Sequence, residues 1–79
     1  MKRVMSYLIK NGFNIEREYS KVTGGFTFNK NDKRFLMQGI FDGDKIIGHE
    51  IRECENWKVV CCGYSQKELI ENMNKVIIC

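Results

Sequence analysis

One histidine and two adjacent cysteines are the residues of this 79-residue chain that could support nucleophilic chemistry. A thiol nucleophile needs a neighbouring base, and the base needs a third group that orients it. His49 could serve as the base for Cys61 or Cys62, but no orienting third residue is evident. His49 alternates with Ile47 and Ile51, which indicates a position packed with the core rather than in a cleft. We therefore predict no catalytic residue and a protein that is not an enzyme.

The cysteines also raise the question of a zinc site, because thiolates and imidazoles are the usual zinc ligands. Their spacing lacks a Cys-x2-Cys pair, and adjacent cysteines of a strand point to opposite faces of the sheet. The first residues carry charges at Lys2, Arg3 and Lys10 and show no signal-peptide cleavage site, so a reducing cytosol is expected. We predict no metal site and free thiols at Cys54, Cys61, Cys62 and Cys79.

Cofactor and membrane binding are both unexpected from the sequence. Gly24 and Gly25 join two expected strands and open no helix, and the chain has neither a Gly-Lys-Ser/Thr phosphate loop nor a dinucleotide fingerprint. No run reaches the roughly 18 apolar residues that a membrane helix requires. We predict no cofactor, no membrane association and a cytoplasmic location in a bacterial host cell.

The charged residues form a mixed pattern that favours binding over chemistry. The formal net charge is +3, and basic residues gather around one expected turn and the strands beside it. Acidic residues interleave with them, whereas nucleic-acid-binding surfaces usually show a basic stripe. Trp57 and Tyr64 bracket the last expected strand, where core packing is the simpler interpretation and a protein interface is the alternative. The candidate binding residues are Glu16, Glu18, Lys30, Lys33, Arg34, Glu50, Arg52, Glu53, Trp57 and Lys58.

Length and composition are those of one small globular domain spanning residues 1–79. With 43% hydrophobic and 29% charged residues the chain should fold, although so small a core provides only a few kcal/mol of stability. A homodimer is therefore an open alternative. The chain lacks proline and alanine and is rich in Lys, Asn and Ile, which indicates an AT-rich genome such as that of a low-GC bacterium or its phages and plasmids.

The first part of the chain is predicted to form a helix and a hairpin. Helical spacing of apolar residues predicts a helix over residues 2–11. Residues 14–20 then alternate as in a half-buried strand, and a turn at residues 23–25 leads to a short second strand around residues 26–28. In the first strand, Ile15, Arg17 and Tyr19 are expected on one face, and Glu16, Glu18 and Ser20 on the other.

The remainder of the chain is predicted to form three more strands and a second helix. Asp42-Gly43 is its strongest turn signal, because glycine tolerates positive φ and aspartate can bond its own backbone. Ser65 and Glu68 have the spacing of a capping box, which begins a helix with an apolar stripe. The expected elements are a central strand over residues 33–41 with both faces partly covered, a returning strand over 45–53, a last strand over 57–62 and a helix that reaches Ile77.

Together these elements predict an α+β fold, an antiparallel meander of four or five strands flanked by N- and C-terminal helices. The order resembles that of the double-stranded RNA-binding domain, and Gly63-Tyr64-Ser65-Gln66-Lys67 falls where that family begins its last helix. The resemblance implies RNA binding through a lysine cluster at this helix start. Here only Lys67 is present, and it is followed by Glu68 and Glu71.

The lack of a catalytic constellation, a cofactor motif and a metal site favours a binding protein. We predict a non-enzymatic protein that occupies the surface of a host protein or protein–nucleic acid complex. The most specific version of this prediction is a phage or mobile-element inhibitor of a host defence protein, an anti-CRISPR candidate. Its acidic residues could imitate nucleic-acid phosphates. The alternative is a nucleic-acid-binding regulator with a basic patch of Lys30, Lys33, Arg34 and Lys58.

Overall fold

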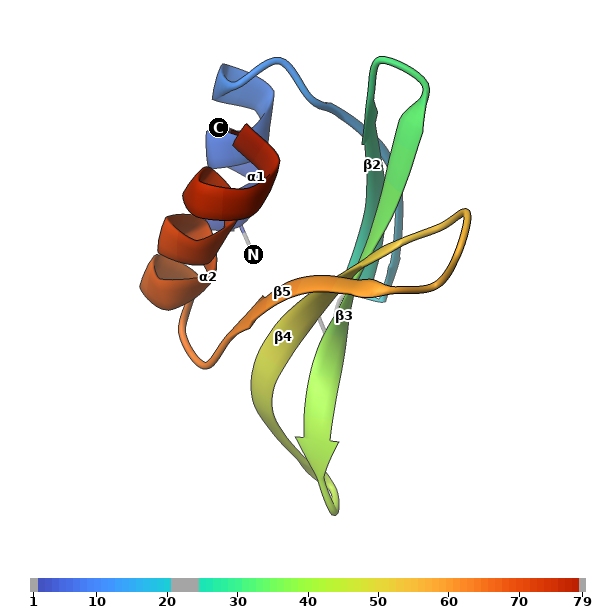
Figure 1. Cartoon of the computed structure of the whole chain (residues 1–79). Coiled ribbons are helices and arrows are strands. Elements are labelled where there is room, and N and C mark those ends of the chain that lie inside the picture. Colours follow the sequence, from blue (N-terminus) through green and yellow to red (C-terminus); the bar gives the residue numbers. More distant parts are fainter. Residues whose placement is uncertain (1, 21–24, 79) are drawn as a thin grey trace.

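The computed structural model describes residues 2–20 and 25–78. The strands form one antiparallel sheet in the order β1-β2-β3-β4-β5, with a helix before and after it (Figure 1). This architecture confirms the predicted α+β class, the meander and the flanking helices. The elements are α1 (Lys2–Lys10), β1 (Asn14–Ser20), β2 (Gly25–Lys30), β3 (Lys33–Asp42), β4 (Lys45–Glu53), β5 (Val59–Gly63), α2 (Gln66–Met73) and the π-helical turn η1 (Asn74–Ile78).

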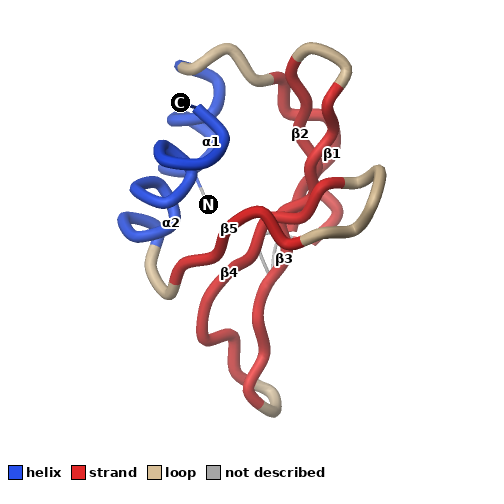
Figure 2. The backbone as a smooth tube through the Cα atoms, in the orientation of Figure 1, coloured by secondary structure: helices blue, strands red, loops and turns tan. Residues whose placement is uncertain are grey.

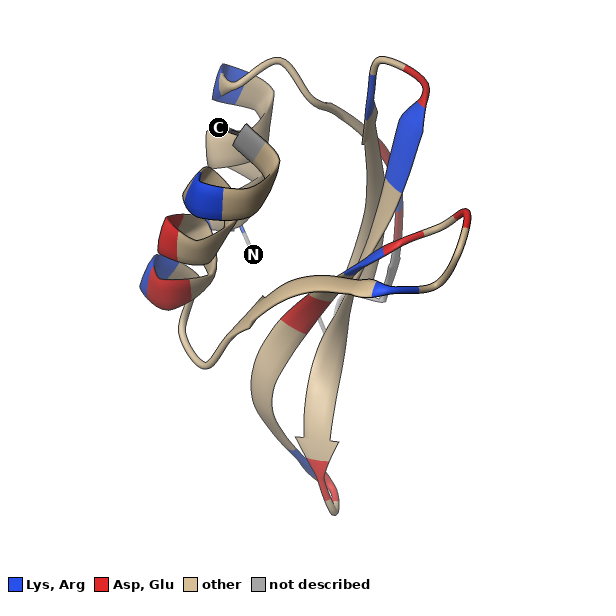
Figure 3. Ribbon diagram, viewed as in Figure 1, with Lys and Arg blue, Asp and Glu red and all other residues tan. Residues whose placement is uncertain are grey.

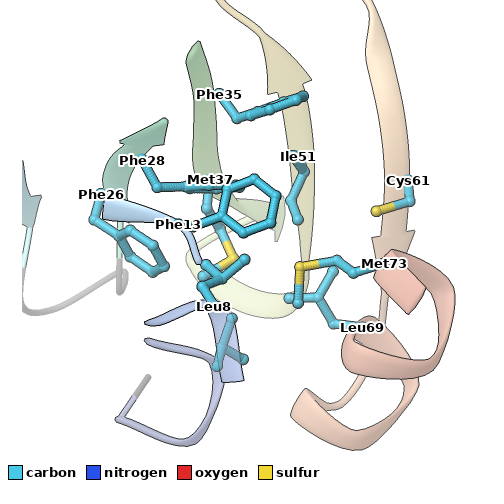
Figure 4. Close-up of a cluster of buried hydrophobic side chains, with 11 residues drawn as sticks. Leu8, Phe13, Phe26, Phe28, Phe35, Met37, Ile51, Cys61, Leu69 and Met73 are labelled. Carbon is cyan, nitrogen blue, oxygen red and sulfur yellow. The ribbon is translucent and has the colours of Figure 1, made fainter. Parts of the chain in front are cut away.

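Both helices lie on one side of the sheet, and the core fills the space between the two layers (Figure 2). Val4 and Leu8 of α1 are four residues apart, so they share one helical face, and both are fully buried. Phe28 and Phe35 sit opposite each other on β2 and β3, with stacked rings 5.2 Å apart between centroids. The buried hydrophobic residues, ten of which are labelled in Figure 4, are Val4, Leu8, Phe13, Phe26, Phe28, Phe35, Met37, Ile51, Cys61, Leu69 and Met73.

The ends of the helices are set by local signals in the sequence. Gly12 follows α1 with a φ of +88°, a left-handed conformation that glycine adopts without strain. The Phe13 N–H then donates to the Leu8 carbonyl at 3.0 Å, which directs the Phe13 ring into the core. At α2 the Ser65 hydroxyl accepts from the Glu68 N–H at 3.1 Å, so the predicted N-cap is confirmed.

Two tight turns join the three central strands. Asn31 and Asp32 connect β2 to β3 with φ values of 50° and 68°, as in a type I′ hairpin. Asp42 pairs with Lys45 at the end of β3 and β4, and Gly43 between them has a φ of 64°. The predicted Asp42-Gly43 turn is therefore confirmed. The predicted turn at residues 23–25 lies outside the described residues except for Gly25, which begins β2.

The predicted alternation of β1 is wrong because the strand contains a bulge. Ile15 pairs with Phe28 and Arg17 pairs with Thr27, so Glu16 is an extra residue between them. Ile15 therefore shares a face with the core phenylalanine, whereas Arg17 lies on the opposite face. An assignment of alternate residues to opposite faces, made from the sequence, cannot detect such an extra residue.

The expected packing of Ile47 with the core is also wrong, whereas the expectation for β3 is confirmed. Ile47 is the extra residue of a bulge in β4, because Gly48 pairs with Ile40 and Ile46 pairs with Phe41, and its side chain is 43% exposed. His49 itself is half-buried. β3 is the central strand of the sheet: Phe35 and Met37 are buried under the helices, and Leu36 and Ile40 on the other face are half-buried, as expected for a strand with both faces partly covered.

The last strand begins later, and the last helix ends earlier, than the sequence predicts. β5 begins at Val59, and Trp57 lies before it in a turn with a φ of 62°. α2 ends at Met73, and the apolar stripe expected to reach Ile77 continues as η1. The extra width of a π-helical turn moves its side chains off the α-helical stripe.

The β3–β4 hairpin extends beyond the rest of the sheet (Figure 1). β2 pairs with β3 only as far as Met37, and β5 pairs with β4 only from His49 onward. Among the described residues, the two-stranded segment at residues 40–48, which we call the arm, pairs with no third strand and is covered by no helix. It makes the molecule elongated at 35 × 22 × 22 Å.

Candidate binding surface

Four of the ten predicted site residues, Glu16, Arg34, Glu50 and Arg52, lie on the side of the sheet that faces away from the helices, which we call the open face. Residues that alternate with the buried Phe28, Phe35 and Ile51 point to this side. Its charged residues come from β1, β3 and β4, so pairing between strands brings Glu16 to Arg34, whereas Glu50 and Arg52 are neighbours on one face of β4. The open face carries Glu16, Thr27, Asn29, Arg34, Leu36, Gln38, Glu50 and Arg52.

Glu16 and Arg34 form the first polar cluster on the open face. The Arg34 Nη2 lies 2.7 Å from Glu16 Oε1, and Arg34 Nε lies 3.1 Å from both carboxylate oxygens. The Asn29 amide donates to Glu16 Oε2 at 2.7 Å. Hydrogen bonds from Arg34 and then from Asn29 lower the pKa of Glu16 below its usual value, so this carboxylate is ionised and its charge is matched. The β1 bulge is what carries Glu16 to this position.

A second cluster crosses β3 and β4. Gln38 Nε2 and Arg52 Nε both donate to Glu50 Oε1, at 2.7 and 2.9 Å. Partial burial by itself raises the pKa of Glu50, but the hydrogen bonds from Gln38 and Arg52 outweigh it and lower the pKa. The Gln38 contact was not anticipated from the sequence, although Gln38 and Glu50 are register partners.

Trp57 is held against the second cluster in an uncommon backbone conformation. Arg52 Nη1 donates to the Trp57 carbonyl at 2.8 Å, and the guanidinium carbon lies 5.5 Å from the ring centroid. A positive φ is rare for a bulky residue, and here the β4–β5 turn imposes it, since Trp57 N–H donates to the Glu53 carbonyl at 2.8 Å. The side chain is nevertheless 51% exposed, so the core interpretation of Trp57 is wrong.

The other aromatic residue that brackets β5 is also exposed. Tyr64 is 64% exposed at the opposite end of the strand, so the core interpretation is wrong there too. Val59, at the Trp57 end, is 48% exposed. An apolar surface therefore borders the paired charges of the open face at Trp57 and Val59.

The remaining predicted site residues are distributed over other parts of the surface. Glu53 accepts a hydrogen bond from Asn56 at 2.9 Å within the β4–β5 turn, next to the exposed Lys58. Glu18 is exposed on the edge strand β1. Lys30 and Lys33 face each other on the helix-covered side, because they alternate with Asn29 and Arg34.

The predicted basic patch is therefore divided between two faces of the sheet. Figure 3 marks the positions of basic and acidic residues along the ribbon. Arg34 and Arg52 are paired with carboxylates on the open face, and Lys30 and Lys33 lie on the other face. The acidic residues are divided too, because Glu16 and Glu50 are matched by those same arginines. In the part of the chain that the structure describes, the open face thus offers neither a basic stripe nor a row of unmatched carboxylates.

His49 and the cysteines were weighed as a nucleophile pair, and the structure places them differently. His49 is opposite Gly63 and Cys61 is opposite Ile51, so His49 and Cys61 are diagonal neighbours on the helix-covered face. Burial, together with the neighbouring Cys62, raises the pKa of Cys61 to about 11, so its thiol is protonated at neutral pH and is a poor nucleophile. Cys62 is exposed and points to the opposite face.

Cys54, Cys61 and Cys62 are free thiols, and Cys79 lies outside the described residues. Within residues 2–20 and 25–78, no three His, Cys, Asp or Glu side chains come together in a way that could hold a metal ion. Neither α1 nor α2 is long and apolar enough to cross a membrane.

Two surface features were missed from the sequence. The arm exposes Phe41 to 54% and Ile47 to 43%. A groove of about 410 Å³ lies between the β2–β3 and β4–β5 turns, which meet where Cys54 N–H donates to the Arg34 carbonyl at 3.0 Å. The exposed arm and the groove both depend on how far neighbouring strands extend along the sheet. The alternation of apolar and polar residues in the sequence does not encode those lengths. The groove is lined by Asp32, Lys33, Arg34, Glu53, Cys54 and Glu55.

Comparisons of the chain with family models, with curated proteins and with solved structures found no significant match.

Proposed function

We propose that this protein is a non-enzymatic binding module that occupies the surface of another protein through its open face, with Trp57 as the central anchor. The observation that carries the proposal is the exposed Trp57, which the β4–β5 turn holds in a left-handed conformation and whose carbonyl accepts from Arg52, itself bonded to the Glu50–Gln38 pair. Tryptophan and arginine are the residues that most often dominate the energy of protein interfaces.

Preorganisation is the physical reason to assign this role to Trp57. The Trp57 backbone is already held by hydrogen bonds and its ring lies beside the Arg52 guanidinium, so binding orders less of the chain and more of the contact energy appears as affinity. The neighbouring charges are matched within the chain, so a partner that covers them meets satisfied hydrogen-bonding groups rather than isolated ions. The exposed Val59 extends the apolar contact area next to the ring.

The finer form of the proposal concerns the partner. The AT-rich composition favours a phage or mobile element of a low-GC bacterium, whose small proteins would act in the cytoplasm of the host cell. We therefore propose inhibition of a host defence protein by steric occupation of its surface, in which the open face covers a functional site of the host protein.

The test is affinity capture from lysates of low-GC bacteria, with three forms of the chain compared side by side. Trp57→Ala removes the anchor, and Ile9→Ala is the matched control because Ile9 is 60% exposed on α1, far from the open face. We expect a defined host protein to bind the wild type and Ile9→Ala but not Trp57→Ala. With the purified partner, Trp57→Ala should weaken Kd by about 30-fold, the effect of a hot-spot residue of about 2 kcal/mol.

Two outcomes would contradict the proposal. A partner that binds Trp57→Ala as tightly as the wild type would exclude the open face as the interface. Binding of duplex DNA or RNA that weakens steeply with salt, and that is lost in the double variant Lys33→Glu and Arg34→Glu, would instead establish a nucleic-acid-binding regulator. Fluorescence anisotropy with labelled duplexes at low salt measures this directly.

A further inference from the structure

A pocket of about 270 Å³ lies on the helix-covered side of the molecule, where the β2–β3 turn meets η1. It is separate from the open face and from Trp57. One part of its lining is cationic and another part is apolar, and no carboxylate is present among the described residues that line it. The pocket is lined by Phe13, Lys30, Asn31, Lys33, Phe35 and Ile77.

The cationic part consists of two lysines that the hairpin forces together. Lys30 and Lys33 are direct cross-strand partners, and the two-residue turn between them fixes this register. Like charges opposite each other destabilise a strand pair. Arg34, the next residue of β3, has its own carboxylate partner on the other face. Within residues 2–20 and 25–78 neither lysine forms an ion pair.

The position of the Lys30 ammonium is fixed before any ligand binds. Its Nζ donates to the Asn11 carbonyl at 3.0 Å and lies 5.2 Å from the centroid of the Phe13 ring. These contacts hold the charge at the rim of the apolar part. Lys33 is exposed, so its ammonium can move onto a bound group.

The apolar part is built from the edge of the core. Phe13 and Phe35 are 4% and 5% exposed, and their rings make an edge contact with centroids 6.2 Å apart. Ile77 reaches the pocket from η1, a π-helical turn of the kind that is rare and concentrated at functional sites. At about 30 Å³ per water of liquid, the volume corresponds to a ligand of roughly ten non-hydrogen atoms.

We propose that this pocket binds a small amphipathic anion, a carboxylate joined to an apolar body of the size of a medium-chain acid. The carboxylate lies between the ammonium groups of Lys30 and Lys33, and the apolar body covers Phe35 and Ile77. The charge of the ligand removes the repulsion between the lysines, so binding also stabilises the fold. This site acts independently of the proposed protein-binding surface.

The test is a titration of the full chain with octanoate, followed by NMR chemical shifts and by calorimetry. We expect saturable binding with the largest shifts at Phe13, Phe35 and Ile77. Lys33→Gln should weaken binding by about tenfold, because one charge-assisted hydrogen bond is lost. This variant should fold normally, since it removes an exposed charge that is repelled by Lys30. Lys58→Gln, an exposed lysine of the β4–β5 turn, is the matched control and should bind octanoate like the wild type.

Neutral and purely ionic probes complete the experiment. 1-Octanol lacks the charge and inorganic phosphate lacks the apolar body, so both should bind at least about tenfold more weakly than octanoate. The proposal is overturned by any of three results: no saturable octanoate binding at millimolar concentration, equal binding of octanoate and either probe, or unchanged affinity in Lys33→Gln.

Discussion

A single glycine, Gly63, decides how closely the sheet and helix α2 approach each other. Gly63, the last residue of β5, lies against the first turn of α2. A Cβ at this position would be 2.5 Å from the Leu69 nitrogen and 2.7 Å from its Cα. Because these are backbone atoms, no side-chain rotation can relieve the overlap. Glycine at position 63 is thus a requirement of the contact between sheet and helix.

The substitution Gly63→Ala should therefore destabilise the protein by about 3 kcal/mol, the upper part of the range for overpacked sites. Gly39→Ala is the control, because a Cβ there would meet only side-chain atoms, those of Ile46 at 3.4 Å and of Phe41 at 3.7 Å. We expect the control to change the free energy of unfolding by less than about 1 kcal/mol. Urea denaturation followed by tryptophan fluorescence measures both variants, and equal destabilisation of the two would refute the argument.

At the scale of elements, the cross-strand polar clusters tie the meander together on the open face. Glu16 and Arg34 join β1 to β3, and Gln38, Glu50 and Arg52 join β3 to β4. The carboxyl pKa values of Glu16 and Glu50 are both lowered below the ordinary value of 4.5. Folding therefore favours the ionised form of both groups, and the strand contacts depend on that form.

This linkage predicts that stability falls in acid. The unfolded chain takes up protons at these carboxyls at a higher pH than the folded chain does, so the free energy of unfolding decreases as pH drops below about 4.5. Above the ordinary carboxyl pKa the stabilisation is fully present. The measurement is the stability to thermal unfolding at several pH values between 3 and 7, compared for the wild type, Glu50→Gln and Glu55→Gln.

Glu50→Gln should flatten the pH dependence, because the substituted side chain no longer titrates. Glu55→Gln removes an exposed glutamate outside both clusters and should retain the wild-type slope. If both variants keep the full wild-type slope, the Glu50 cluster does not contribute to acid sensitivity.

At the scale of the whole molecule, stability should differ between the body and the arm. The body is a sheet backed by helices through a core of buried side chains, whereas the arm at residues 40–48 has only its own two strands. Isolated two-stranded ribbons are marginally stable in water. The arm should therefore open locally without unfolding of the body.

Hydrogen exchange measures this difference directly. Amides of the paired arm residues, such as Ile46, should exchange faster than those of Met37 and Ile51, which belong to the same two strands inside the body. Body amides should exchange at rates set by global unfolding. Equal protection along the entire β3–β4 hairpin would show that the arm is stabilised to the same extent as the body.

The sequence by itself determined the local elements of this protein. Each predicted helix was marked by a signal within a few residues, the Asn11-Gly12 stop for α1 and the Ser65 cap for α2. The Asp42-Gly43 turn likewise specified the central hairpin. Local backbone preferences and short-range hydrogen bonds act over such distances, so the order of elements and the meander were predictable.

Only the tertiary structure decided which side chains meet. The bulge at Glu16, the left-handed turn at Trp57 and the overhang of the arm all depend on pairing between strands distant in sequence. One extra residue in a strand moves every later side chain to the other face, so alternation cannot tell which charges are matched. For this reason the sequence predicts the candidate residues only as a set, and the register of the sheet decides how they are divided between the open face, the pocket beside Lys30 and Lys33, and the turns.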